Sequence, residues 1–195
     1  MIQKDHYLEI ASKYGHCASW AVWAEPGSKP KSNVGDISIF DEDKNPKILD
    51  QLNPNVIMVG LNISRRIENR FGNFHDSRPQ GQDYKIRYGF RDTKCYGAYM
   101  TDIIKDFEQV VSGNVISFLN RNKDFERQNI LLFRQELLDL KSDNIVIIAF
   151  GNHVFNILDK HFKSEYQIVK VPHYSKHISK EDYRNEIGEL MSNVI

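Results

Sequence analysis

Four short apolar runs, rich in β-branched residues, mark the chain from residue 55 onward. Such runs are typical of strands that are buried on both faces of a sheet. The expected strands span 55–62, 98–104, 143–151 and 166–171, and helical spacing of apolar residues separates them over 124–140 and 152–162. Because strands alternate with helices, the pattern predicts an α/β fold: a three-layer sandwich with a central, mostly parallel four-stranded sheet and helices on both faces.

The first 54 residues carry shorter and weaker patterns. The expected elements are a helix over 4–15, a strand over 18–24, a partner strand over 36–40 and a short helix over 45–52. We expect Trp20 and Trp23 to lie in the core. A length of 195 residues suits one domain, 1–195, with an N-terminal helix and extension over 1–54 and an α/β core over 55–195.

Composition excludes some classes of protein. The chain has 26 basic and 26 acidic residues, so its total charge does not indicate a nucleic-acid-binding protein, and only a local excess could. Cys17 and Cys95 form no metal or disulfide spacing, which favours a reducing compartment. No apolar window is long enough to span a bilayer, and the first ten residues lack the apolar core of a signal peptide. We therefore expect a cytoplasmic protein with no membrane partner, whose oligomeric state the sequence does not predict.

A long basic and aromatic segment follows the first buried strand. Residues 61–94 hold eight basic and four acidic residues and show no sustained period. A loop of this length in a compact domain is typically functional or disordered. A solvated surface and a binding surface are both open interpretations.

Polar residues follow each of the four expected strands. In open parallel sheets, ligands bind outside the carboxyl ends of the strands. The segments at those ends are 60–64, the basic loop, 101–102, 151–153 and 172–177. The topology therefore predicts one site where all of them meet.

Four motifs in this order give the chain a resemblance to the uracil-DNA glycosylase superfamily. They are "GLNIS" at 60–64, "YMTDIIK" at 99–105, "IIAFGNHVFNIL" at 147–158 and "VPHYSKHIS" at 171–179. They resemble the family's Gly-x-Asn-Pro motif, its strand ending in Thr-Asn-x-x-Lys, its strand–glycine–helix step and its His-Pro-Ser-Pro motif. The departures are Ile63, Tyr174 and Lys176 in place of prolines, and Asp102 in place of the middle Asn. The resemblance implies a uracil-DNA glycosylase-like fold with no cofactor and no metal.

The resemblance assigns the catalytic roles to Asn62 and His173. Asn62 stands where the family positions its water, although an amide orients a water without accepting its proton. His173 stands where a histidine donates a hydrogen bond to the departing base. The alternative, purely structural interpretations are that Asn62 forms a turn and that His173 lies in a surface loop. The spacing of His173 and His177 would suit a metal pair, but no third ligand is evident.

The resemblance also assigns a base-binding set, which comprises Gly60, Leu61, Phe71, Phe74, Asp102 and Ser175. A flipped base held against an aromatic ring is physically sensible. Core anchoring by Phe71 and Phe74 is equally open. An ionised Asp102 only accepts hydrogen bonds, so it suits a base edge rich in donors and disfavours uracil. Capping of the following turn by Asp102 is the other interpretation.

The residues expected to contact the nucleic-acid backbone are Arg65, Arg66, Arg70, Gly151, Asn152, Lys176 and Lys180. The basic side chains would neutralise phosphates without reading sequence. Gly151 and Asn152 begin a helix, whose N–H groups can hold a phosphate. An ordinary helix cap is the competing interpretation.

The resulting hypothesis is a glycosylase that hydrolyses the N-glycosidic bond of a damaged or non-standard base, with single-stranded or mismatched DNA as its partner. A second hypothesis is a catalytically weak or inactive homologue that binds nucleic acid, a nucleotide or a protein. A third is an unrelated α/β domain.

Overall fold

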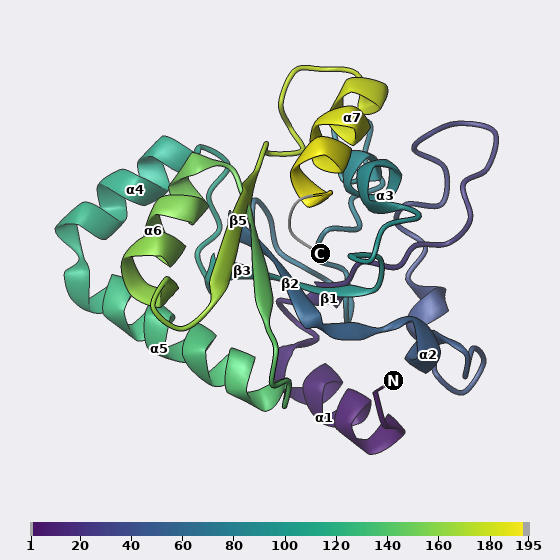
Figure 1. Ribbon diagram of the computed structural model, residues 1–195, viewed down its shortest axis with the longest axis horizontal. Coiled ribbons are helices and arrows are strands. Elements are labelled where there is room, and N and C mark those ends of the chain that lie inside the picture. The colour runs from purple at the N-terminus through teal and green to yellow at the C-terminus, as the bar shows by residue number, and fades with distance from the viewer. Residues whose placement is uncertain (1, 193–195) are drawn as a thin grey trace.

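The computed structural model describes residues 2–192 and shows an α/β fold around a five-stranded sheet (Figure 1). The strands are β1 (Ser19–Trp20), β2 (Asn53–Asn62), β3 (Ala98–Ile104), β4 (Val146–Phe150) and β5 (Gln167–Val171). Their order is β1-β3-β2-β4-β5, and β1 is antiparallel to its neighbour while the others are parallel. The four predicted core strands are confirmed, and β1 adds a fifth at the edge.

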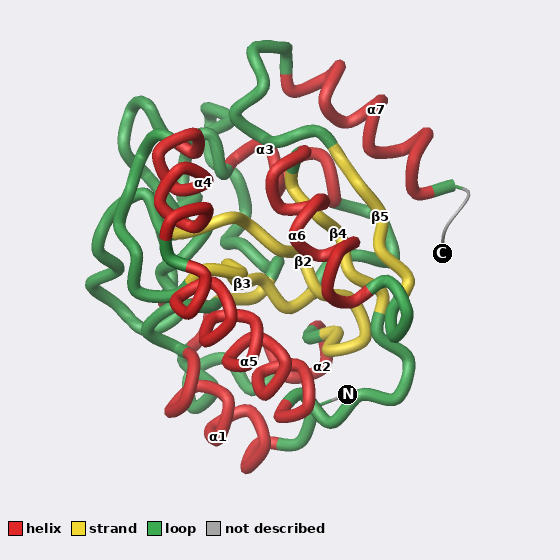
Figure 2. Tube along the Cα trace, turned by 90° about the vertical axis from the view of Figure 1, so that its left-hand side faces the viewer, coloured by secondary structure: helices red, strands yellow, loops and turns green. Residues whose placement is uncertain are grey.

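The helices are α1 (Lys4–Tyr14), α2 (Ile48–Gln51), α3 (Tyr84–Phe90), α4 (Ser112–Arg121), α5 (Lys123–Asp139), α6 (Asn152–Phe162) and α7 (Lys180–Met191). One face of the sheet is covered by α4, α5 and α6, and Figure 2 looks onto that face. The other face is covered by α3 and α7, which lie side by side (Figure 1). No helix in the described part of the chain is long and apolar enough to cross a membrane.

Alternation along β2 explains why both faces carry helices. Ile57 and Val59 belong to the apolar cluster that includes α5 and α6, whereas Val56 and Met58 belong to the cluster that includes α3 and α7. Successive strand side chains point to opposite faces, so a continuous apolar run needs a cover on each side. The predicted helices on both faces are confirmed.

The N-terminal 54 residues pack onto this core. Trp20 is fully buried and its ring lies 5.0 Å from the ring of Tyr99, and Trp23 is 4% exposed. Both tryptophans therefore lie in the core, as predicted.

Two expectations for the polar segments were wrong. Residues 36–40 do not form a strand, because a 3-10 helix, η1, spans Ser38–Phe40. Asp36 Oδ1 accepts hydrogen bonds from the N–H and the hydroxyl of Ser38, which favours this local turn over strand pairing. The basic loop also contains a helix that the pattern did not indicate, α3.

Candidate functional site

The carboxyl ends of the parallel strands meet at one edge of the sheet. Gly151, directly after β4, donates its backbone N–H to the carbonyl of Val171 at the end of β5 (2.9 Å). The rings of Phe74, from the loop after β2, and Tyr174, from the loop after β5, lie 6.2 Å apart. The loops after Gly60 and after Pro172 are therefore on the same edge, as predicted. We call this place the strand-end site, defined by Gly60, Phe74, Asp102, Phe150, His173 and Tyr174.

Ser175 holds the imidazole of His173 in one tautomer. The backbone N–H of Ser175 donates to Nδ1 of His173 (3.1 Å), and Ser175 Oγ lies 2.8 Å from the same nitrogen. Because a backbone N–H donates to Nδ1, the proton of the neutral ring is on Nε2. No described residue hydrogen-bonds to Nε2. Burial lowers the pKa of His173 to about 4, so the ring is a neutral donor near pH 7.

Asp102 lies on β3 and is 4% exposed. Asn73 Nδ2 donates to Oδ2 of Asp102 (2.8 Å) and to the carbonyl of Cys17 (2.8 Å). Burial raises the pKa of Asp102 to about 6, and the Asn73 hydrogen bond and the charge of Lys105 oppose that rise. Oδ1 receives no hydrogen bond from the described residues.

Gly60 leaves the space that the Asp102 carboxyl group occupies. A Cβ on residue 60 would lie 2.2 Å from Oδ1 of Asp102 and 3.1 Å from Cζ of Phe74. We expect Gly60→Ala to destabilise the protein by about 1–3 kcal/mol, because the carboxyl group has to leave its hydrogen bond with Asn73. Urea unfolding measures this loss.

Gly113→Ala is the matched control, because a Cβ there meets nothing within 4 Å. It lies on α4, where alanine is the better helix former, so that variant should unfold at the same urea concentration or a higher one. Asp102→Ala in the Gly60→Ala background should restore part of the loss. An unchanged unfolding midpoint for Gly60→Ala would contradict this packing.

Three aromatic rings close the middle of the strand-end site. Phe74 and Phe150 lie 6.2 Å apart, and Tyr174 lies 6.2 Å from the first and 5.3 Å from the second. Phe74 has a φ of 59°, which is uncommon for a residue with a side chain and turns its ring toward Gly60. The ring of Tyr174 therefore packs against both Phe74 and Phe150.

Phe71 does not belong to this site. It is fully buried, its ring packs against Tyr7 (5.6 Å) and Phe40 (5.4 Å), and its N–H donates to the carbonyl of Gly15 (2.7 Å). The expectation that Phe71 stacks on a base is wrong, since the ring anchors the loop to the N-terminal helix.

Buried carboxyl groups make the strand-end site acidic. Asp83 is 7% exposed and accepts a hydrogen bond from the N–H of Asp76 (2.8 Å). Burial raises the pKa of Asp83 to about 7, and the charge of Asp76 adds to the rise. Burial also raises the pKa of Tyr174, and the charges of Asp83 and Asp102 raise it further. Where ionised, these carboxyl groups accept hydrogen bonds, so they suit a ligand edge that donates them.

Asn62 ends β2 and fixes the loop that follows β3. Its Nδ2 lies within hydrogen-bond distance of the carbonyls of Ile63 (2.8 Å), Phe107 (2.9 Å) and Gln109 (2.8 Å). These carbonyls use the donor capacity of the amide, which leaves Oδ1 as the atom able to accept from a water. Asn62 therefore has a structural role here, and its expected role in orienting water is limited to Oδ1.

A buried ion pair lies behind Asp102. Lys105 Nζ is 2.6 Å from Oε2 of Glu136, and the two side chains are 8% and 0% exposed. The Tyr99 hydroxyl donates to Oε1 of Glu136 (2.7 Å). Burial opposes the charge of Lys105, but Glu136 outweighs it and raises the pKa of Lys105. The fixed ammonium group favours the ionised form of Asp102, against the effect of burial.

The basic residues predicted to contact phosphates are spread over several elements. Their ion pairs join Arg65 to Asp76 (3.1 Å), Arg70 to Glu42 (3.2 Å), Lys176 to Glu186 (2.7 Å) and Lys180 to Glu181. Arg66 is exposed and has no ion pair with a described residue. A Cβ on Gly15 would lie 2.6 Å from Cγ of Arg70, so Arg70 lies beside α1 and does not join a cluster with Lys176.

The remaining predicted residues have ordinary structural roles. Leu61 is 8% exposed and packs in the core. The N–H of Gly151 is used by Val171, so its expected phosphate contact is wrong. Asn152 begins α6 with an exposed side chain. His177 is exposed, and no three His, Cys, Asp or Glu side chains within residues 2–192 form a metal site.

Three residues that build this region were not predicted as site residues. Asn73 orients Asp102, and Asp83 adds the second buried carboxyl group. His75 is 4% exposed, stacks on Trp23 at 5.4 Å and lies 3.0 Å from the carbonyl of Val22 through Nε2. The only signal was their place in a long loop after a buried strand.

Comparison of the chain with protein-family models finds no match, and comparisons with curated proteins and with solved structures find none either.

Proposed function

We propose that this chain hydrolyses the N-glycosidic bond between a base and its sugar in DNA, and that near pH 7 it prefers a base whose edge carries an amino donor. The observation that supports this most is the free Nε2–H of a neutral His173, placed at the same sheet edge as a buried carboxyl group with one free oxygen. The motif resemblance points to the same reaction.

The chemistry explains the need for a neutral donor. As the bond between the sugar carbon and the base nitrogen breaks, the base takes the electron pair and becomes negative, and the sugar becomes positive. A water oxygen then bonds to the sugar carbon and releases a proton, while the base gains one. A donor aimed at the departing base stabilises the charge that develops only in the transition state. His173 supplies that hydrogen bond.

Asp102 determines which base fits. Its ionised carboxylate accepts hydrogen bonds from an amino or imino group, as on adenine, cytosine or guanine derivatives. Below the pKa of about 6 it is protonated and can also donate to a carbonyl. Extrusion of a base costs a few kcal/mol, least where pairing is absent, so single-stranded or mismatched DNA is the preferred substrate.

A second candidate is a homologue that binds nucleic acid without cleaving it. Two observations favour it: the donors of Asn62 are used by backbone carbonyls, and the ring of Tyr174 closes the gap between Phe74 and Phe150. Asn62 cannot accept the proton of the attacking water, so we expect a slow reaction or none.

The test is release of bases from labelled single-stranded and mismatched oligonucleotides that each carry one modified base. Uracil, hypoxanthine and deaminated or alkylated purines form the panel, and alkali reveals each abasic site as a strand break. Binding to the same oligonucleotides is measured beside it. Release supports the glycosylase, binding without release supports the silent homologue, and the absence of both overturns both.

A further inference from the structure

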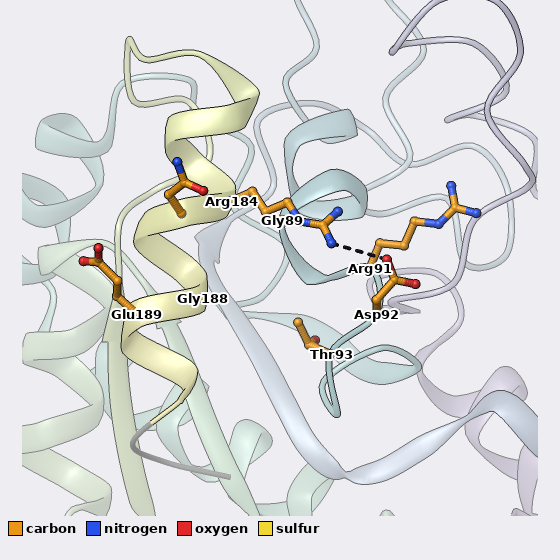
Figure 3. Close-up of a pocket in the computed structure, with 8 residues that line it drawn as sticks. Gly89, Arg91, Asp92, Thr93, Arg184, Gly188 and Glu189 are labelled. Carbon is orange, nitrogen blue, oxygen red and sulfur yellow. Dashed lines mark hydrogen bonds and ion pairs between the residues drawn. The ribbon is translucent and has the colours of Figure 1, made fainter.

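Two adjoining surface pockets lie along the seam between α3 and α7. They have volumes of about 460 and 570 Å³, and both are lined by Arg91, Asp92 and Arg184. Figure 3 shows the smaller pocket, in which Arg184 of α7 reaches toward Asp92 beside α3. We call the combined depression the α3–α7 trough and define it by Lys29, Tyr84, Tyr88, Arg91, Lys180 and Arg184.

The larger pocket is basic. Five basic residues and one acidic residue line it, although the whole chain has no net charge. Arg87 is one of the five, and its guanidinium donates to the carbonyls of Ala24, Pro30 and Ser32 (3.0, 2.7 and 2.9 Å), which holds the loop that forms the outer wall. Of the other four, Arg91, Lys180 and Arg184 pair with Glu25, Glu181 and Asp92, and Lys29 has no ion pair with a described residue.

The ion pairs of the trough are ones that an anion can replace. Arg91 pairs with Glu25 at 3.0 Å and Arg184 pairs with Asp92 at 3.3 Å, and the two acidic side chains are 83% and 71% exposed. Exposed pairs of this kind contribute little to stability. Lys29 is exposed and has no acidic partner among the described residues. A phosphate could therefore bind Lys29 directly and could replace Glu25 and Asp92 as the partner of Arg91 and Arg184.

Two tyrosine rings of α3 line the larger pocket, and other lysines lie over them. Tyr84 and Tyr88 are four residues apart on α3 and therefore share one face of the helix, and both are half-buried. Lys31 Nζ lies 5.1 Å from the ring centroid of Tyr84, and Lys180 Nζ lies 4.3 Å from that of Tyr88. Aromatic faces next to cations along a groove are the features that single-stranded nucleic acids use, by stacking and by phosphate contact.

The trough is joined to the strand-end site by α3. Asp83, the residue before α3, is one of the buried carboxyl groups. Lys85 Nζ donates to the carbonyls of Lys176 and Ile178 (2.9 Å each), which fixes the loop carrying His173 to α3. α3 therefore contacts both the loop that carries His173 and the larger pocket of the trough.

We propose that the α3–α7 trough binds the phosphodiester backbone of single-stranded nucleic acid. The strand's place beside the strand-end site rests on the function proposed above, but binding in the trough does not depend on cleavage. The phosphates would lie mainly in the larger pocket, where basic residues outnumber acidic ones.

The test compares a triple variant, Lys29→Ala with Arg91→Ala and Arg184→Ala, with a control, Lys44→Ala with Arg127→Ala and Lys163→Ala. The control removes the same charge from exposed residues that pair with Asp41, Asp124 and Asp159 and do not line the trough. Affinity for a fluorescent, unmodified oligothymidylate is measured by anisotropy over a salt series. We expect at least tenfold weaker binding for the trough variant at low salt, and a slope of log K against log salt smaller by about 2.

The control should keep a slope close to that of the wild type. Equal losses in both variants, or no loss in the trough variant, would overturn the proposal. Polyglutamate, and inorganic phosphate in excess, are the competing probes. If polyglutamate binds as tightly with the same dependence on these three cations, or if phosphate at millimolar concentration abolishes oligonucleotide binding, the trough is a site for other anions. Base release without loss of binding in the trough variant contradicts the trough alone, whereas trough-dependent binding without release contradicts the glycosylase alone.

Discussion

His173→Ala should slow base release about a hundredfold and leave affinity for an uncleaved oligonucleotide within about threefold. The Nε2–H of His173 points from a ring whose other nitrogen is already occupied by Ser175. Its hydrogen bond strengthens as the departing base gains charge, so its loss falls on turnover and little on binding. Single-turnover release and anisotropy measure the two effects separately.

The dependence on pH checks that the donor is neutral. Because burial lowers the pKa of His173 to about 4, the ring gains no proton between pH 5 and 8. A step in rate near pH 6 is expected from Asp102 instead, whose pKa burial raises to about 6. That step should persist in His173→Ala and vanish in Asp102→Asn. A step that vanishes with His173 would show that its imidazolium form is the active one.

His177→Ala is the matched control, since this histidine is exposed and lies four residues further on. Its rate should equal that of the wild type. Ser175→Ala keeps the backbone N–H that fixes the tautomer and loses only the hydroxyl contact, so it should cost less than His173→Ala. Equal rates for His173→Ala and His177→Ala would remove His173 from the reaction.

The parallel strands could be predicted because a strand that is buried on both faces is a continuous run of apolar residues. β3 spans Ala98–Ile104, the same residues as the apolar run. α3 has no such pattern, because it has seven residues and buries Lys85 and Arg87 against backbone carbonyls. Carbonyls from distant segments satisfy those charges, and no local pattern shows such a contact.

The topology predicted the edge of the sheet at which the site lies, but it did not predict the direction in which each side chain points. Phe71 and Phe74 are three residues apart and both have positive φ, yet one packs against α1 and the other covers Gly60. Asn73, between them, reaches Asp102 across 29 residues of chain. Composition and spacing do not show which of the two rings enters the site. Both phenylalanines were therefore predicted as site residues, and Asn73 was not.

Asp102→Asn should move base preference toward uracil by roughly ten- to a hundredfold, the range expected when one charge-assisted hydrogen bond is exchanged. The ionised carboxylate accepts only, whereas an amide also donates to a carbonyl. A protonated carboxyl group does the same, so wild type at pH 5 should resemble the variant. Release from uracil and from adenine or cytosine derivatives that keep the amino group, measured at pH 5 and 8, gives the ratio.

The same substitution should also stabilise the protein, and only at high pH. The folded state holds the Asp102 proton up to a pKa of about 6, above the ordinary value of 3.8, so burying the charge costs stability that begins above pH 4 and is complete above pH 6. Two pKa units correspond to about 3 kcal/mol, which Asp102→Asn should recover at pH 8 and not at pH 4. Asp83 titrates in both proteins, and because the charge of Asp102 raises the pKa of Asp83, the gain at pH 8 includes the relief of that repulsion. Urea unfolding at the two pH values tests the burial, and the ratio of released bases tests the recognition. A stability gain without any change in preference would leave Asp102 as a buried acid that no base contacts.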